Sequence, residues 1–253
     1  MTGRPVQVVT FDLWDCMFVD DTDEPKRAAA GVPPKPVARR RLVHDALNRH
    51  APIPQETVDL AYDVADAAFN EVWHEQHVTW SVHDRLSVLL AGLKRELPDD
   101  ELAELVRLHE EMELEFRPDP APGLHDALRE LHGRFPLAVV SDAIFSPGRC
   151  LRELLRGEGL LDYFGCCAFS DEIGRSKPDP AMYQSVADHF GATFDGIVHV
   201  GDRPHNDIGG AHAIGARGVL LTVVKQRPLE GHAPDAVCSD YAGLPAIITT
   251  MNS

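Results

Sequence analysis

The sequence predicts an α/β protein in which helices cover both faces of a parallel sheet, and a second, all-helical part is inserted after the first strand. From residue 120 onward, short apolar runs alternate with helical patterns. Strands separated by helices form parallel sheets, because a parallel pair needs a crossover connection. Residues ~25–117 instead have helical periodicity and almost no strand signal. The predicted core is therefore Rossmann-like, with three layers.

Six apolar runs have the length of a buried strand. They cover residues 6–11, 136–140, 166–169, 196–200, 218–223 and 236–238. Helical patterns separate the runs from one another over residues 122–135, 147–160, 179–191 and 206–216. The first run is of the same apolar type as the others, so we expect it to join the same sheet.

The inserted part reads as four helices, over residues 36–50, 54–78, 81–97 and 99–116. Their starts are marked by Pro54, by a capping box that joins Ser81 to Asp84, and by acidic residues at Asp99. A proline-rich segment, residues 117–123, leads back to the sheet. We therefore expect residues 1–20 and 118–253 to form the core domain, and residues 21–117 to form a helical domain.

Composition excludes several classes of function. The net charge is −16, from 24 Lys and Arg against 40 Asp and Glu, so no basic stripe is available for a nucleic-acid partner. No apolar run approaches the ~18 residues that span a bilayer, so we expect no membrane partner. The first strand begins too early for a signal peptide, and the five cysteines lack metal or disulfide spacing. These features favour a cytoplasmic protein.

Polar residues follow four of the predicted strands, at the edge of the sheet where ligands bind in open parallel sheets. They are Asp12 after the first strand, Ser141 and Asp142 after the second, Lys177 in the loop after the third, and Asp202 and Asp207 after the fourth. The carboxyl ends of parallel strands meet at one edge, so we expect these side chains to share a cleft.

The predicted cleft suits a metal ion and a phosphate group. Carboxylates as close together as Asp12, Asp202 and Asp207 repel one another, and a hard divalent cation that accepts oxygen ligands compensates them. Such ligands favour Mg²⁺ over zinc. The ammonium of Lys177 and the hydroxyl of Ser141 can hold a phosphate beside the cation. Asp12 can then attack phosphorus and form an aspartyl-phosphate.

These motifs resemble those of the haloacid dehalogenase superfamily, which is dominated by Mg²⁺-dependent phosphatases. The residues that carry the resemblance are FDLWDCM at 11–17, VVS ending at Ser141, RSKPDP around Lys177 and VGDRPHNDIGGA at 200–211, in the family's order. The helical insertion after the first motif is similar to the family's cap domain, placed between motifs one and two. The resemblance covers nearly the whole chain.

The resemblance implies a role for each site residue. Asp12 would be the nucleophile and a metal ligand, and the main-chain carbonyl of Trp14 would be a second ligand. Asp202 and Asp207 would complete the metal site, Asp207 directly or through water. Ser141 and Lys177 would hold the phosphate. Asp142, Trp14 and Arg203 are expected to contact the substrate, since they flank these motifs.

Position 14 departs from the family's phosphatases, which carry an aspartate there that protonates the leaving oxygen. Trp14 has one N–H donor and no useful pKa, so it cannot do this work. Three functions remain open: a Mg²⁺-dependent hydrolase of small phosphomonoesters that works without this acid, a 2-haloacid-dehalogenase-like hydrolase, and a weakly active or inactive protein that binds a phosphorylated ligand. Asp15, or one of the acids of the run Asp20-Asp21-Thr22-Asp23, is a further candidate to replace the acid.

For the first of these functions we expect a small phosphorylated metabolite as the partner and Mg²⁺ as the cofactor. Arg85 and Trp80, in the helical insertion, are possible contacts of the substrate. The sequence is compatible with a monomer or a homodimer.

Overall fold

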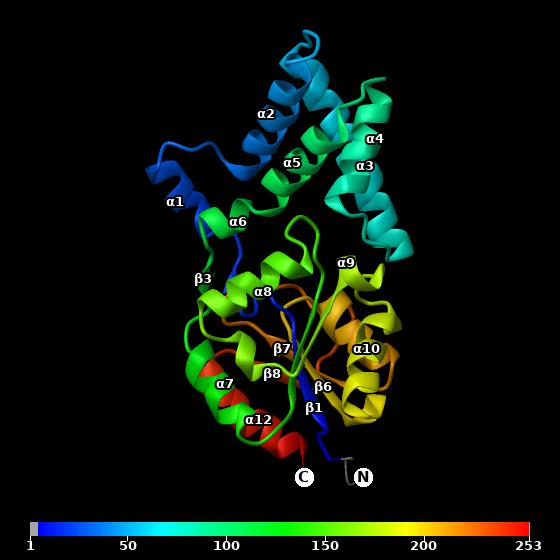
Figure 1. Ribbon diagram of the computed structural model, residues 1–253. Helices are drawn as coiled ribbons and strands as arrows, with labels where there is room; N and C mark the ends of the chain where they lie inside the picture. The colour runs from blue at the N-terminus through cyan, green and yellow to red at the C-terminus, as the bar shows by residue number, and fades with distance from the viewer. Residues whose placement is uncertain (1–4, 253) are drawn as a thin grey trace.

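The computed structural model describes residues 5–252, within which a six-stranded sheet has the order β5-β4-β1-β6-β7-β8 (Figure 1). The strands are β1 (Val8–Phe11), β4 (Leu137–Ser141), β5 (Cys166–Phe169), β6 (Ile197–Gly201), β7 (Arg217–Leu221) and β8 (Ala236–Cys238). Every neighbouring pair is parallel. All six predicted strands are present, and the predicted fold class is confirmed.

The strand order reverses at β1, which lies between β4 and β6. The chain passes from β1 to β4 and β5 on one side, and then crosses to β6, β7 and β8 on the other side. In open α/β sheets such a reversal leaves a crevice at the carboxyl ends of the strands, where ligands bind. The residues that follow β1, β4 and β6 therefore occupy the most favourable edge of this sheet for a site.

Alternating side chains of the strands form two separate hydrophobic layers. Val9 and Phe11 belong to the cluster that includes α7 (Leu124–His132), α8 (Gly148–Gly157) and α12 (Leu244–Met251). Val8 belongs to a second cluster with α10 (Pro180–Phe190) and α11 (Gly210–Ala213). This alternation follows from the two-residue period of a strand. The two helical layers flank the sheet in Figure 1.

Short helical turns complete the core. They are α9 (Ser170–Ile173), η1 (Leu161–Tyr163), η2 (Phe194–Gly196), the π-helical turn η3 (Pro204–Gly209) and η4 (Tyr241–Gly243). The region predicted as one helix over residues 206–216 is thus divided between η3 and α11. Its glycine-rich sequence explains the division, because glycine disfavours a long regular helix.

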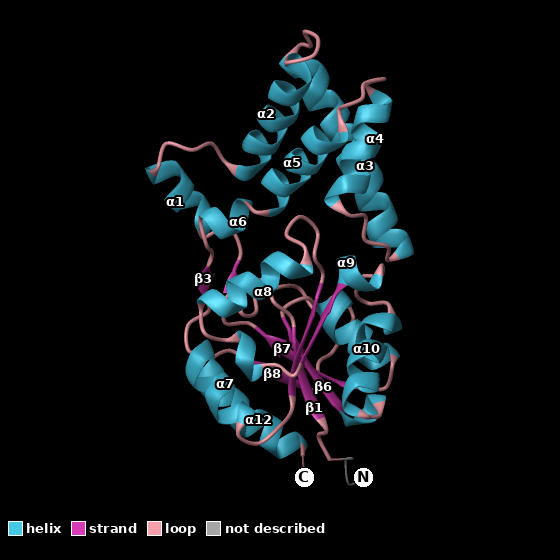
Figure 2. Cartoon of the chain, viewed as in Figure 1, coloured by secondary structure: helices cyan, strands magenta, loops and turns pink. Residues whose placement is uncertain are grey.

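The inserted part contains α1 (Asp23–Ala29), α2 (Lys35–Asn48), α3 (Gln55–Gln76), α4 (Val82–Gly92), α5 (Asp99–Glu110) and α6 (Met112–Glu115). Helices α2 to α5 pack around a hydrophobic cluster of their own (Figure 2). The predicted capping box at the start of α4 is present. We call residues 23–115 the helical segment.

Two details of the helical segment differ from the prediction of four helices. The acidic run at residues 20–23 leads into the short helix α1, because Asp23 and Glu24 lie in its first turn, where carboxylates favour helix formation. The last predicted helix is divided at Glu111 into α5 and α6. After the division, Glu113 faces the core and accepts a hydrogen bond from the hydroxyl of Ser146.

A two-stranded antiparallel ribbon joins the helical segment to the sheet. It consists of β2 (Phe18–Val19) and β3 (Asp119–Pro120). The hydroxyl of Thr22 accepts a hydrogen bond of 2.8 Å from the Asp119 amide, and Lys26 Nζ lies 2.6 Å from the Asp119 carboxylate. The chain therefore enters and leaves the helical segment at one place. Within residues 5–252, none of the helices is both long enough and apolar enough to cross a bilayer.

A buried histidine makes the stability of the helical segment depend on pH. His109 of α5 is 1% exposed, and its Nδ1 donates to the carbonyl of Leu105 at 2.7 Å. Its Nε2 is buried and has no hydrogen-bond partner among the described residues. Burial lowers the pKa of His109 to about 4. The folded protein therefore binds this proton less readily than the unfolded chain, in which histidine has a pKa of ~6.5.

We predict that His109 destabilises the fold by up to ~3 kcal/mol as the pH falls from ~6.5 to ~4, because stability rises with pH wherever the unfolded chain binds more protons. The free energy of unfolding in urea should be measured for His109→Leu and for the control His83→Leu, whose imidazole is 59% exposed. On acidification, the free energy of unfolding of His109→Leu should rise relative to that of His83→Leu. The titration of the carboxylates affects both variants equally and cancels from this comparison. A constant difference contradicts the prediction.

Candidate active site

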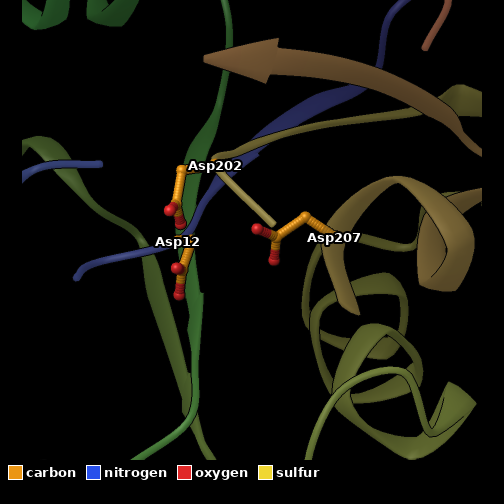
Figure 3. A group of neighbouring side chains, drawn as sticks. All are labelled: Asp12, Asp202 and Asp207. Atoms are coloured by element: carbon orange, nitrogen blue, oxygen red, sulfur yellow. The ribbon is translucent and has the colours of Figure 1, made fainter. Parts of the chain in front are cut away.

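Three carboxylates meet at the carboxyl end of the sheet (Figure 3). Asp12 directly follows β1, Asp202 directly follows β6, and Asp207 lies in η3. All three are buried, and one oxygen from each lies within 4.8 Å of the others. We call these residues the carboxylate cluster. The structure thus brings together the three side chains that the sequence analysis predicted as metal ligands.

The backbone around η3 is adapted to hold Asp207. Its Oδ2 accepts a hydrogen bond of 2.8 Å from the Arg203 amide. A side chain at Gly201 would clash with it, because a Cβ atom there would lie 2.3 Å from the Asp207 carboxyl carbon. The glycine that ends β6 is therefore required for the close approach of Asp207 to the strand.

Lys177 links two members of the carboxylate cluster. Its Nζ lies 2.6 Å from Asp12 Oδ1 and 2.7 Å from Asp207 Oδ1. Burial by itself would lower the pKa of Lys177, but the carboxylates of Asp12 and Asp207 outweigh it and raise the pKa well above its usual value. The side chain is therefore an ammonium ion, and it offsets part of the negative charge of the cluster.

His199 of β6 contacts the carboxylate of Asp207. Its Nε2 lies 3.2 Å from Asp207 Oδ1, and its Nδ1 lies 2.8 Å from the hydroxyl of Thr10. Burial lowers the pKa of His199, although Asp207 opposes the shift. A neutral imidazole that donates from Nε2 accepts from Thr10 at Nδ1. Burial tends to raise the pKa of Asp207, yet Lys177 and His199 outweigh burial and lower it.

Asp202 is held by an arginine that the sequence analysis did not identify. Arg227 Nε donates to Asp202 Oδ2 at 2.6 Å, and its Nη2 donates to Asp15 Oδ2 at 3.0 Å. Lys225 Nζ lies 2.6 Å from the same oxygen of Asp15. The Asp15 carboxylate therefore forms ion pairs with two cations, and this argues against Asp15 as the replacement acid. Arg227 and Lys225 lie in an irregular loop after β7, where no motif marked them.

The other oxygen of Asp202 is unusual. Oδ1 is buried and has no hydrogen-bond partner among residues 5–252. Burial, together with the charges of Asp12 and Asp207, raises the pKa of Asp202 to about 7, although Arg227 opposes the shift. A buried carboxylate oxygen without a partner is destabilising. A cation bound among the three carboxylates would remove this cost, and oxygen-only donors fit a hard divalent ion.

Ser141 ends β4 and Asp142 directly follows it, next to the strand that leads to Asp12. The hydroxyl of Ser141 is fully buried, and its distance of 3.4 Å from the Asp142 carbonyl indicates a weak hydrogen bond that leaves it available to a ligand. Asp142 Oδ1 accepts a hydrogen bond of 2.9 Å from the Lys177 amide. Burial raises the pKa of Asp142 to about 6, and Lys177 opposes the shift.

A cavity of about 240 Å³ opens between the core and the helical segment. We call it the interface cavity. On the core side it is lined by three residues that the sequence analysis expected at the substrate, Trp14, Asp142 and Arg203. The remaining lining residues are Asp20, Asp21, Lys35, Arg39, Glu113, Ile144, Phe145 and Ser146. Arg85 is not among the lining residues, and its guanidinium binds Asp66 at 2.5 Å.

The chain is similar to phosphatases and to a dehalogenase. It is 30% identical over 134 residues to a phosphoserine phosphatase of Thermus thermophilus, a match that covers 47% of this chain and 52% of the relative. It is 29% identical over 131 residues to a phosphoglycolate phosphatase of Aliivibrio fischeri, covering 51% and 56%. The chain thus spans about half the length of these curated relatives.

A solved structure matches over almost the whole chain. The 2-haloacid dehalogenase of Pseudomonas syringae pv. Tomato has 24% sequence identity and a TM-score of 0.68, with 97% of this chain and 99% of that chain covered. At this identity the likeness concerns the fold. The model of the haloacid dehalogenase-like hydrolase family matches residues 6–215, which include all four motifs. The chain therefore belongs to the haloacid dehalogenase-like hydrolase family.

Proposed function

We propose that the protein is a Mg²⁺-dependent phosphatase that hydrolyses a small phosphomonoester through an aspartyl-phosphate at Asp12. The observation that carries the proposal is the carboxylate cluster, in which Asp202 Oδ1 is buried without a partner beside Asp12 and Asp207. Such a cluster fits a divalent cation, and an anionic substrate would otherwise be repelled. The similarity to phosphoserine and phosphoglycolate phosphatases supports the same assignment.

In this proposal Asp12, Asp202, Asp207 and the main-chain carbonyl of Trp14 hold the Mg²⁺ ion. The ion supplies positive charge that stabilises the transferring phosphoryl group. Lys177 and the hydroxyl of Ser141 bind the phosphate oxygens. His199 and the Arg203 amide keep Asp207 in place, because both contact its carboxylate.

Asp12 attacks phosphorus with a carboxylate oxygen, and the bond from phosphorus to the leaving oxygen breaks. Lys177 contacts Oδ1 of Asp12, so Oδ2 is the oxygen that we assign to the attack. Water then attacks the phosphorus atom of the aspartyl-phosphate, which releases inorganic phosphate and restores Asp12. The leaving oxygen must gain a proton in the first step, and the indole of Trp14 cannot supply it. Esters with acidic leaving groups should therefore react best.

We further propose that residues 21–117 act as a cap domain over a core of residues 1–20 and 118–253. Three features support this division: the separate hydrophobic cluster of α2 to α5, the ribbon at the crossing, and the interface cavity, which has lining residues from both parts. Closure of the cap would exclude water and strengthen the electrostatic interactions in the cavity.

The second candidate is a hydrolase similar to 2-haloacid dehalogenases. The likeness in fold to the Pseudomonas syringae enzyme favours it. The lack of an acid at position 14 favours it too, because a halide leaves carbon without needing a proton. In that reaction Asp12 would attack carbon and displace halide. Dependence on Mg²⁺ separates the two candidates. Phosphate hydrolysis needs a cation to offset the charge of the phosphate, whereas displacement of halide from carbon involves no phosphate and needs no such cation. A protein that binds a phosphorylated ligand without hydrolysing it is the third possibility.

We predict that Asp12→Asn lowers the rate of p-nitrophenyl phosphate hydrolysis by at least ~10³-fold, because the amide cannot act as a nucleophile. Circular dichroism should establish that the variant is folded. Asp126→Asn, at an exposed position of α7, is the matched control and should retain full activity. Turnover by Asp12→Asn near the rate of the control would rule out the covalent route.

We predict that EDTA abolishes phosphatase activity and that added Mg²⁺ restores it. Binding of Mg²⁺ should raise the melting temperature of the wild-type protein, and Asp202→Asn should weaken Mg²⁺ binding measured by calorimetry, because the amide removes charge from the cluster. Full phosphatase activity in EDTA would contradict the magnesium site. Release of halide from 2-chloropropionate in EDTA, without phosphatase activity, would establish the dehalogenase alternative.

We predict that Trp14→Asp restores the missing acid. General acid catalysis contributes ~10²–10⁴-fold, so hydrolysis of alkyl phosphates should rise by up to this factor. Hydrolysis of p-nitrophenyl phosphate should rise far less, since its leaving group needs little protonation. The measurement is kcat for a series of esters ranked by leaving-group pKa, and Trp14→Asn is the control without a titratable group. An equal response of both ester classes contradicts the role assigned to position 14.

A further inference from the structure

Arg39 of α2 is a buried cation without an ionic partner. It is 6% exposed, and its guanidinium carbon lies 3.5 Å from the centroid of the Phe145 ring. Its Nε is buried without a hydrogen-bond partner, and no carboxylate of residues 5–252 forms an ion pair with it. Burial of an unpaired charge is destabilising, and arginine does not escape it by losing its proton.

The other cations near Arg39 are compensated. Lys35 Nζ lies 2.9 Å from Asp23 and 3.2 Å from Glu113. Arg85 also contacts this ring, with its guanidinium carbon 3.9 Å from the Phe145 centroid, but its guanidinium binds Asp66. Unlike Lys35 and Arg85, Arg39 therefore has no carboxylate partner among the described residues, and it lines the interface cavity.

Arg39 lies on α2, on the side of the interface cavity formed by the helical segment, whereas Arg203 directly follows Asp202 of the carboxylate cluster. Burial lowers the pKa of Arg39, and carboxylates of the helical segment, chiefly Glu113, oppose this shift. Burial also tends to lower the pKa of Arg203. There the charges of Asp12, Asp202 and Asp207 outweigh burial and raise the pKa. Arg203 thus belongs to the phosphate end of the cavity, and Arg39 belongs to the end formed by the helical segment.

The size of the interface cavity limits the ligand. Its volume of about 240 Å³ corresponds to roughly eight water molecules at ~30 Å³ each, which is enough for a phosphate and a short carbon chain. Glu113 and Asp21, which also line the cavity, lie within ion-pair distance of Lys35. Asp20 accepts a hydrogen bond of 3.0 Å from the Asp21 amide and forms no ion pair with Arg39 among the described residues. These acids therefore leave the charge of Arg39 available.

We propose that Arg39 binds a carboxylate of the substrate, so that the protein acts on phosphate esters of small hydroxy acids. The planar guanidinium matches a carboxylate in shape, and Phe145 holds it by stacking on its face. A carboxylate is also smaller than a second phosphate group, as the cavity requires. The proposal rests on the phosphatase function, because the phosphate end of the same ligand occupies the carboxylate cluster.

The first test compares 2-phosphoglycolate with 2-hydroxyethyl phosphate, which has the same chain length and no carboxylate. The wild-type protein should hydrolyse 2-phosphoglycolate with a kcat/KM at least ~10-fold higher. Arg39→Met should bring the ratio close to one, and Arg39→Lys should retain part of it. Arg85→Met removes the other cation from Phe145 and should leave the ratio unchanged. A wild-type ratio near one, or an equal loss in Arg85→Met, would overturn the proposal.

The second test separates this proposal from the phosphatase function. Binding of the same two esters to the Asp12→Asn variant is measured by calorimetry with Mg²⁺ present, so that no turnover is needed. Tighter binding of 2-phosphoglycolate that is lost with Arg39→Met supports the carboxylate site even if p-nitrophenyl phosphate is not hydrolysed. Equal binding of both esters, or tighter binding of ethylene glycol bisphosphate than of 2-phosphoglycolate, would refute it while leaving the phosphatase function intact.

Discussion

The ammonium of Lys177, placed between Asp12 and Asp207, is the interaction on which the rest of the site depends. Three buried carboxylates repel one another, and each would favour its neutral form if nothing offset the charge. Lys177 offsets part of it at 2.6 and 2.7 Å, and Arg227 offsets another part at Asp202. The remaining negative charge is concentrated on three carboxylates that lie together at this edge of the sheet (Figure 3). The fold thus holds a site whose charge is incomplete without a cation.

The two ends of the interface cavity are made by different parts of the chain. In the function proposed above, the phosphate would lie at the carboxyl edge of the sheet, where Asp12, Ser141 and Asp202 end or directly follow strands. The remainder of the substrate would face the helical segment, from which Lys35 and Arg39 of helix α2 line the interface cavity. Reaction chemistry therefore has a rigid support, whereas recognition depends on how closely the helical segment approaches the sheet.

The parts of the site that the sequence predicted share one property: each follows a buried strand or lies in a short motif. Apolar runs locate strand ends, and so Asp12 and Asp202 could be placed without coordinates. His199 and Thr10 were missed because they lie inside the strands, where a pattern of burial does not identify hydrogen-bond partners. Arg227 was missed because it reaches the site from an irregular loop. Ribbon strands of two residues also leave no periodic signal.

The ribbon of β2 and β3 has a consequence for the evolution of the chain. The polypeptide enters and leaves the helical segment at paired positions, next to each other in space. A recombination event that exchanged the residues between these positions would replace Arg39 and its surroundings without removing a strand of the parallel sheet or any member of the carboxylate cluster. New substrate preferences could then arise by exchange of one contiguous stretch of gene, while the carboxylate cluster was inherited unchanged.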